Sequence, residues 1–129
     1  MYSARRRLLR EFITINNEPS TYYTITHNPQ NIQECMANIH CLPGYRYDGM
    51  NFNIELTIPD TYPFRPPELK FLSPIKSQHV DSKTGRMCLD ILNERWSPAM
   101  TLSQLITSIC SILTDGQGTR YSSRLHPLL

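Results

Sequence analysis

Hydrophobic and polar residues alternate most regularly over residues 51–58, where every second position is apolar. This is the period of a strand that is buried on one face. Residues 22–26 are rich in β-forming residues, residues 34–41 alternate in the same way, and residues 69–72 continue the series. Because short turns join the first three segments, the pattern predicts a four-stranded antiparallel meander with one polar face.

Two other segments carry the helical period. In residues 3–16, Leu8, Phe12 and Ile15 fall on one side, so we expect an amphipathic N-terminal helix. Residues 101–104, with the sequence Thr-Leu-Ser-Gln, form a capping-box pattern that predicts the start of a second helix. This helix is expected to end near Asp115. Its buried stripe is expected to consist of Leu102, Leu105, Ile106, Ile109, Cys110 and Leu113.

The segments between these elements have no regular period. Residues 59–67 hold four prolines, which exclude both helix and sheet ladder. Residues 73–87 follow neither the strand nor the helix period, which predicts a long irregular loop. Residues 119–129 show no pattern from which an element can be predicted. The order helix, four strands, long loop, helix predicts an α+β fold in which the helices pack against the antiparallel sheet. The 129 residues are enough for one such domain, so we expect a single domain over residues 1–129.

Charge is distributed unevenly along the chain. Lysine and arginine number 13 against 11 acidic residues, but from residue 11 onward the count is 9 against 11. A slightly acidic body argues against a nucleic-acid-binding surface spread over the fold. The basic start is either a docking element for an acidic partner or a solvated helix face. It contains Arg5, Arg6, Arg7 and Arg10.

The cysteines and the apolar runs indicate the compartment. None of the four cysteines forms a Cys-x-x-Cys pair or has a histidine at ligand spacing, so we expect no metal site. Their low density also argues against a disulfide scaffold and favours a reducing, cytoplasmic environment. No apolar run is long enough to span a bilayer, so we expect no membrane insertion.

One cysteine stands apart from the others. Cys35, Cys41 and Cys110 fall on apolar phases, so packing explains them. Cys88 follows the polar, glycine-containing residues 82–86, where exposed reactive groups are expected. From pattern alone, Cys88 is either a reactive thiol or one more small buried residue.

Several motifs then follow one another in order. They are Asp-Gly-Met-Asn-Phe at 48–52, Tyr-Pro-Phe-Arg-Pro-Pro at 62–67, Gly-Arg-Met-Cys-Leu-Asp-Ile-Leu at 85–92 and Trp-Ser-Pro-Ala at 96–99. In these motifs the chain resembles the ubiquitin-conjugating enzymes. The resemblance implies the UBC fold over residues 1–115, with an N-terminal helix, a four-stranded sheet and a central helix. Residues 116–129 are then a divergent tail, and the C-terminus is short because the family's last helices have no counterpart.

The resemblance also implies an activity. Cys88 would accept ubiquitin or a ubiquitin-like modifier as a thioester from an activating enzyme and pass it to a lysine of a substrate. No cofactor would be needed on this chain. A RING-type ubiquitin ligase would assist the transfer, and Trp96 would pack beneath the docking loop. The resemblance assigns ligase contact to Arg5, Arg6, Phe64, Pro98 and Ala99, with the first helix also serving the activating enzyme.

Two departures from the family leave alternatives open. The family's His-Pro-Asn triplet falls on Ser-Gln-His at residues 77–79, so His79 takes the asparagine position. It would either donate a hydrogen bond to the oxyanion, with more pH sensitivity than an amide, or only brace the loop. No carboxylate follows Asp115 to activate the lysine. The alternative function is therefore a weakened or inactive relative that acts as a binding or regulatory module.

A short match suggests a branch of the family. Lys-Thr-Gly at residues 83–85 makes the loop before Cys88 one residue longer than in many relatives. In this it is similar to the peroxisomal branch. We expect a cytoplasmic location, and the alternatives are a nuclear location or recruitment to the peroxisome surface.

Overall fold

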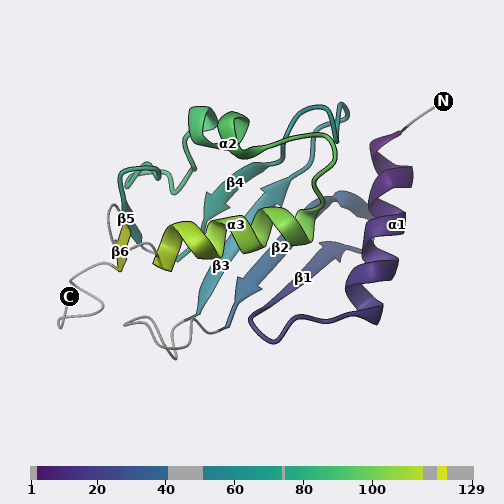
Figure 1. Cartoon of the computed structure of the whole chain (residues 1–129), viewed down its shortest axis with the longest axis horizontal. Coiled ribbons are helices and arrows are strands. Elements are labelled where there is room, and N and C mark those ends of the chain that lie inside the picture. Colours follow the sequence, from purple (N-terminus) through teal and green to yellow (C-terminus); the bar gives the residue numbers. More distant parts are fainter. Residues whose placement is uncertain (1–2, 41–50, 74, 115–118, 122–129) are drawn as a thin grey trace.

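The computed structural model describes residues 3–40, 51–73, 75–114 and 119–121. Figure 1 shows the arrangement of its helices and strands. They are α1 (Ala4–Asn17), β1 (Tyr23–Asn28), β2 (Asn31–Ile39), β3 (Phe52–Thr57), β4 (Glu68–Phe71), β5 (Ile75–Ser77), α2 (Leu89–Arg95), α3 (Leu102–Thr114) and β6 (Thr119–Tyr121).

The main sheet has the predicted meander topology. Its strands lie in the order β1-β2-β3-β4 and every pair is antiparallel. The register sets Ala37 of β2 opposite Ile54 of β3, and Ile54 opposite Phe71 of β4. All three side chains are buried, whereas the alternate positions of β3 are exposed. Because side chains alternate across a strand, this register gathers the apolar residues of neighbouring strands on one face.

The two long helices cover the apolar side of the sheet. In Figure 1, α3 crosses the face of the sheet while α1 stands beside β1 and β2. Leu8 and Phe12 of α1 join the same buried cluster as Leu105 and Ile109 of α3. Tyr23 adds a polar link, because its hydroxyl donates a 3.2 Å hydrogen bond to the carbonyl of Ser103. The α+β arrangement is thus confirmed.

Both long helices begin where their sequences predict. Ser3 caps α1 by accepting a 3.1 Å hydrogen bond from the backbone N–H of Arg6. At α3, the N–H of Gln104 donates to Oγ1 of Thr101 at 3.2 Å, and the N–H of Thr101 donates to Oε1 of Gln104 at 3.0 Å. These are the two reciprocal bonds of a capping box. The stripe of α3 is buried through Ile109, and Cys110 is half-buried.

The structure corrects the expectation for residues 73–87. That segment contains β5, which pairs antiparallel with β6 and sets Ser77 opposite Thr119. Isolated bridges also join Val80 to Met87 and Lys70 to Arg86. Three-residue strands are too short to show a period, so the sequence pattern could not reveal them. The seven-residue helix α2 was likewise not predicted.

Some expectations fall outside the described residues. They concern the turn between the segments 34–41 and 51–58, the position of Cys41, the side chain of Leu113 and the end of the last helix at Asp115. Within the described ranges, no helix has the length and apolar character that crossing a bilayer requires.

Candidate active site

Cys88 is held in place by hydrogen bonds of its own segment. Its backbone N–H donates a 2.7 Å bond to the carbonyl of His79, and the N–H of Met87 donates a 2.9 Å bond to the carbonyl of Leu69 in β4. Met87 and Val80 are buried, whereas Cys88 is exposed. The segment therefore anchors on the core through Met87 and presents the next side chain to solvent.

The turn before Cys88 depends on a glycine. Gly85 has a φ of +79°, and its carbonyl accepts a 2.7 Å hydrogen bond from the N–H of Phe71. A Cβ at this position would lie 2.3 Å from the carbonyl oxygen of Phe71. Only glycine permits both this φ and this close approach to β4. The Gly-Arg-Met-Cys motif thus has a steric basis.

Asp81 closes the same turn. Its carboxylate accepts hydrogen bonds from the backbone N–H of Lys83 at 3.0 Å and from the hydroxyl of Thr84 at 3.1 Å. These bonds, the one from Lys83 first, hold the pKa of Asp81 below its ordinary value. Asp81 therefore stays ionised and keeps residues 81–86 folded beside the cysteine.

The three described cysteines differ in their capacity to react. Burial raises the pKa of the Cys35 thiol to about 12, with the charge of Glu11 adding to the rise. Burial also raises the pKa of Cys110 to about 11. Because the thiolate is the nucleophile, both are poor candidates near neutral pH. Cys88 alone among the three is exposed, and its role as the reactive thiol stays a prediction.

His79 reaches the site through its backbone. Besides accepting from Cys88, its own N–H donates a 3.1 Å hydrogen bond to Oγ of Ser77. Its half-buried ring has Nε2 at 3.4 Å from Nε2 of Gln78. The structure thus brings the backbone of His79 next to Cys88. The chemical role of the imidazole stays a prediction.

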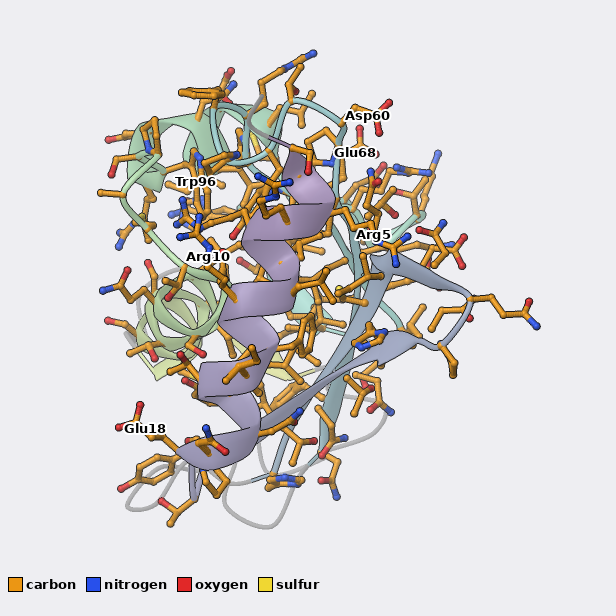
Figure 2. All side chains as sticks on the ribbon, turned by 90° about the vertical axis from the view of Figure 1, so that its right-hand side faces the viewer. Arg5, Arg10, Glu18, Asp60, Glu68 and Trp96 are labelled. Carbon is orange, nitrogen blue, oxygen red and sulfur yellow. The ribbon has the colours of Figure 1, made fainter. Side chains whose placement is uncertain are left out.

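The expected ligase contacts lie in two loops and on α1. Phe64 is 68% exposed, so it does not fold back onto the core. Pro98 and Ala99 are exposed in the loop before α3, and Arg5 and Arg6 are exposed on α1. Figure 2, which looks onto α1, shows Arg5 and Arg10 on different sides of the helix, with Trp96 on the same side of the view as Arg10.

Trp96 connects the two loops, as its predicted structural role requires. Its indole N–H donates a 2.7 Å hydrogen bond to the carbonyl of Pro63. Its ring lies against Tyr62, with centroids 5.6 Å apart. The peptide bond between Tyr62 and Pro63 is cis. The loop that carries Phe64 therefore rests on the residue that begins the Trp-Ser-Pro-Ala motif.

Sequence reasoning missed a polar cluster behind these loops. Glu11 of α1 is the one buried charged residue in the described ranges, and it contacts Arg7 and Tyr62. A signal was present, since Glu11 lies three residues after Leu8 and so falls on the apolar side of the helix. A carboxylate at such a position requires a partner, because burying it alone is costly.

No metal centre is evident at the site. The described part of the chain holds no group of three or more His, Cys, Asp or Glu side chains that could bind a metal ion. What the geometry offers is an exposed thiol on an anchored segment, with an aromatic side chain and a proline displayed on neighbouring loops. Such an open arrangement suits nucleophilic acyl transfer between macromolecules.

Comparison with known proteins bears on this site. The family model described as ubiquitin-conjugating enzyme matches residues 7–122. Ubiquitin-conjugating enzyme E2 T of Xenopus laevis is 38% identical over 113 residues, which are 84% of this chain and 58% of that protein. The chain therefore spans little more than half the length of this relative.

Solved structures agree with the sequence match. Human ubiquitin-conjugating enzyme E2 G1 superposes with a TM-score of 0.77 at 31% identity, covering 85% of this chain and 93% of that one. The ubiquitin conjugating enzyme E2 domain of Toxoplasma gondii gives 0.74 at 33%, covering 86% and 74%. None of these relatives is described as peroxisomal, so that branch stays a prediction. With the motifs, the fold and the exposed Cys88 in agreement, the chain belongs to the ubiquitin-conjugating enzyme family.

Proposed function

We propose that this chain accepts ubiquitin, or a ubiquitin-like modifier, from an activating enzyme and delivers it to an amine of a substrate. The observation that carries the proposal is the exposure of Cys88 on a segment pinned to β4 and to residue 79. An acyl acceptor for a protein modifier must be reachable by a macromolecule yet fixed in position. Among the described cysteines, Cys88 alone meets both requirements.

The chemistry consists of two acyl transfers. The Cys88 thiolate attacks the carbonyl carbon that joins the modifier to the activating enzyme, a C–S bond forms, and the thiolate of the activating enzyme leaves. An amine of the substrate then attacks the new thioester, a C–N bond forms, and Cys88 leaves as a thiolate. The amine loses one proton in the process. Both steps exchange acyl bonds without any change of oxidation state.

Negative charge develops on the carbonyl oxygen when the amine attacks the Cys88 thioester, and a donor near Cys88 would stabilise it. His79 is the side chain that we assign to this role, because its backbone adjoins Cys88 and its ring carries an N–H in every protonation state. Asp81, ionised in the neighbouring turn, helps to keep this loop in place.

The ligase would contact the two loops that Trp96 joins. Phe64 offers an exposed aromatic anchor, while Pro98 and Ala99 complete an apolar patch. Exposed aromatic side chains flanked by polar surface are typical of binding sites. Arg5 and Arg6 would supply charge for the ligase and for the activating enzyme.

A loading reaction tests the acceptor. The chain is mixed with activating enzyme, ATP and ubiquitin and run on a non-reducing gel. We expect an adduct that reducing agent removes, and with Cys88→Ser an adduct that resists reduction or none at all. The matched control is Cys110→Ser, which should load like the parent. A reducible adduct that persists in Cys88→Ser would contradict the assignment.

A weakened, ubiquitin-binding relative is the second candidate. It is favoured by the histidine at position 79 and by the absence of aspartate and glutamate from residues 116–129. A discharge assay separates the two candidates. If the adduct forms but is not lost when free lysine and a RING domain are added, the binding module is favoured. If the RING domain stimulates loss of the adduct, the enzyme is favoured.

A further inference from the structure

The buried carboxylate of Glu11 joins three separate parts of the chain. Its Oε1 accepts a 2.7 Å hydrogen bond from the backbone N–H of Leu102, at the start of α3. Its Oε2 accepts a bond from the hydroxyl of Tyr62 at 2.5 Å and one from Nε of Arg7 at 2.9 Å. The side chain of Glu11 is only 6% exposed. One carboxylate therefore connects α1, the proline-rich loop and α3.

Arg7 extends this cluster to the second loop. Its Nη2 donates a 2.7 Å hydrogen bond to the carbonyl of Met100, and its Nη1 donates one of 3.3 Å to the carbonyl of Pro98. The guanidinium carbon also lies 5.8 Å from the centroid of the Tyr62 ring. The planar guanidinium group of arginine carries several N–H donors in a fixed arrangement, so it can make these contacts at the same time. The ammonium group of a lysine cannot.

The Arg7–Glu11 pair therefore contacts both loops of the expected ligase surface. Tyr62 is two residues before Phe64 in one loop, and the carbonyl of Pro98 belongs to the other loop itself. Buried ion pairs add little stability compared with apolar packing, because desolvation offsets their attraction. An ion pair at this place is better explained by the geometry that it enforces.

We propose that Arg7 and Glu11 are positioning residues that fix the spacing of the Phe64 loop and the Pro98–Ala99 loop for a RING-type ligase. The inference rests on the proposed function for the identity of the partner. Neither side chain needs to touch the ligase. If the ion pair is lost, the loops must be ordered when the ligase binds, which weakens binding without slowing transfer in the saturated complex.

Trp96 permits a test that needs no ligase. It is the only tryptophan of the chain, and its indole N–H bonds to Pro63 beside Tyr62. We expect the indole NMR resonance to shift or broaden in Arg7→Ala and in Glu11→Gln. Arg10→Ala removes an equal charge from the exposed side of the same helix and should leave the resonance unchanged. An unmoved indole signal in both cluster variants would overturn the inference.

The functional arm measures how strongly a RING domain stimulates discharge of the ubiquitin adduct to free lysine. The probe is a RING domain that stimulates the parent protein. In Arg7→Ala we expect the half-saturating RING concentration to rise about fivefold to tenfold, with the rate at saturation and the rate without ligase kept within about twofold. If both rates fell while the half-saturating RING concentration stayed unchanged, Arg7 would have a merely structural role.

Two further variants sharpen this readout. Arg7→Lys keeps the charge but loses the fork, so it should fall between the parent and Arg7→Ala. In a Phe64→Ala background, Arg7→Ala should raise the half-saturating RING concentration much less than it does alone, because both substitutions act through one loop. Full additivity would contradict the proposal. A parent protein that fails to load ubiquitin would instead refute the proposed function, and the Trp96 signal would still decide the loop-spacing role.

Discussion

The backbone N–H of Cys88 donates a 2.7 Å hydrogen bond to the backbone carbonyl of His79. Because this bond joins main-chain atoms, it does not depend on the identity of either side chain. It braces the loop whichever side chain stands at position 79. Replacing the imidazole therefore tests what the ring adds to this backbone contact.

Replacing His79 by alanine tests the contribution of the ring. We expect the thermal midpoint and the formation of the Cys88 adduct to stay close to those of the parent, while discharge to lysine slows by about 10²-fold, as for the loss of one oxyanion donor. His79→Asn should retain most of the rate, since an amide also donates. Equal discharge rates in the parent and in His79→Ala, measured in a single-turnover assay, would leave the imidazole without a catalytic role.

Thiol labelling provides a direct measure of site accessibility. With iodoacetamide near neutral pH, we expect Cys88 to be alkylated before Cys35 and Cys110, because it is exposed while burial raises the pKa of the other two. Mass spectrometry of peptides after brief treatment identifies the order. Denaturant should abolish the difference among the three residues. Preferential labelling of Cys110 in the folded protein would contradict the burial seen here.

Those elements with several periods of a repeating pattern were predictable from sequence. The alternation in β3 and the stripe of α3 each reflect one buried face, so the sequence carries the signal directly. By contrast, β5 has three residues and α2 has seven. Elements of this length are stabilised by tertiary neighbours more than by local preference, which is why their positions needed the structure.

The candidate site was only partly predictable for a similar reason. Cys88 could be singled out because packing accounted for the other cysteines. Two partners of Glu11 lie 51 and 91 residues away along the chain, at Tyr62 and Leu102. A single sequence shows that a buried carboxylate needs partners but not which distant groups supply them.

Alkaline pH should destabilise the fold through its buried thiols. The ordinary thiol pKa is 9.0, and the folded values are about 12 for Cys35 and about 11 for Cys110. Above pH 9.0 the unfolded chain releases protons that the folded chain retains, so the free energy of unfolding falls as pH rises toward 11. Urea titrations measure the slope, which should be shallower in Cys35→Ala. An unchanged slope would mean that Cys35 ionises equally in both states.

Gly85→Ala should destabilise the turn beside the active site. The substitution places Cβ 2.3 Å from the carbonyl oxygen of Phe71 at a φ of +79°, and strained backbone of this kind costs about 1–3 kcal/mol. Gly85→Asn distinguishes the two causes, since asparagine tolerates positive φ but has the same Cβ. We expect it to be no more stable than the alanine variant in urea denaturation, whereas Lys83→Ala, in the same exposed turn, should match the parent.

The start of α3 offers a quantitative test of capping. Thr101→Ala removes the oxygen that accepts from the N–H of Gln104, and the loss should cost about 1 kcal/mol in free energy of unfolding. Thr101→Ser keeps that oxygen, so its free energy of unfolding should fall by only a few tenths of this amount. Because Gln104 returns a bond to the N–H of residue 101, the double variant with Gln104→Ala should lose less than the sum of the single losses. Strict additivity in urea denaturation would show that the two bonds act independently, contrary to a reciprocal cap.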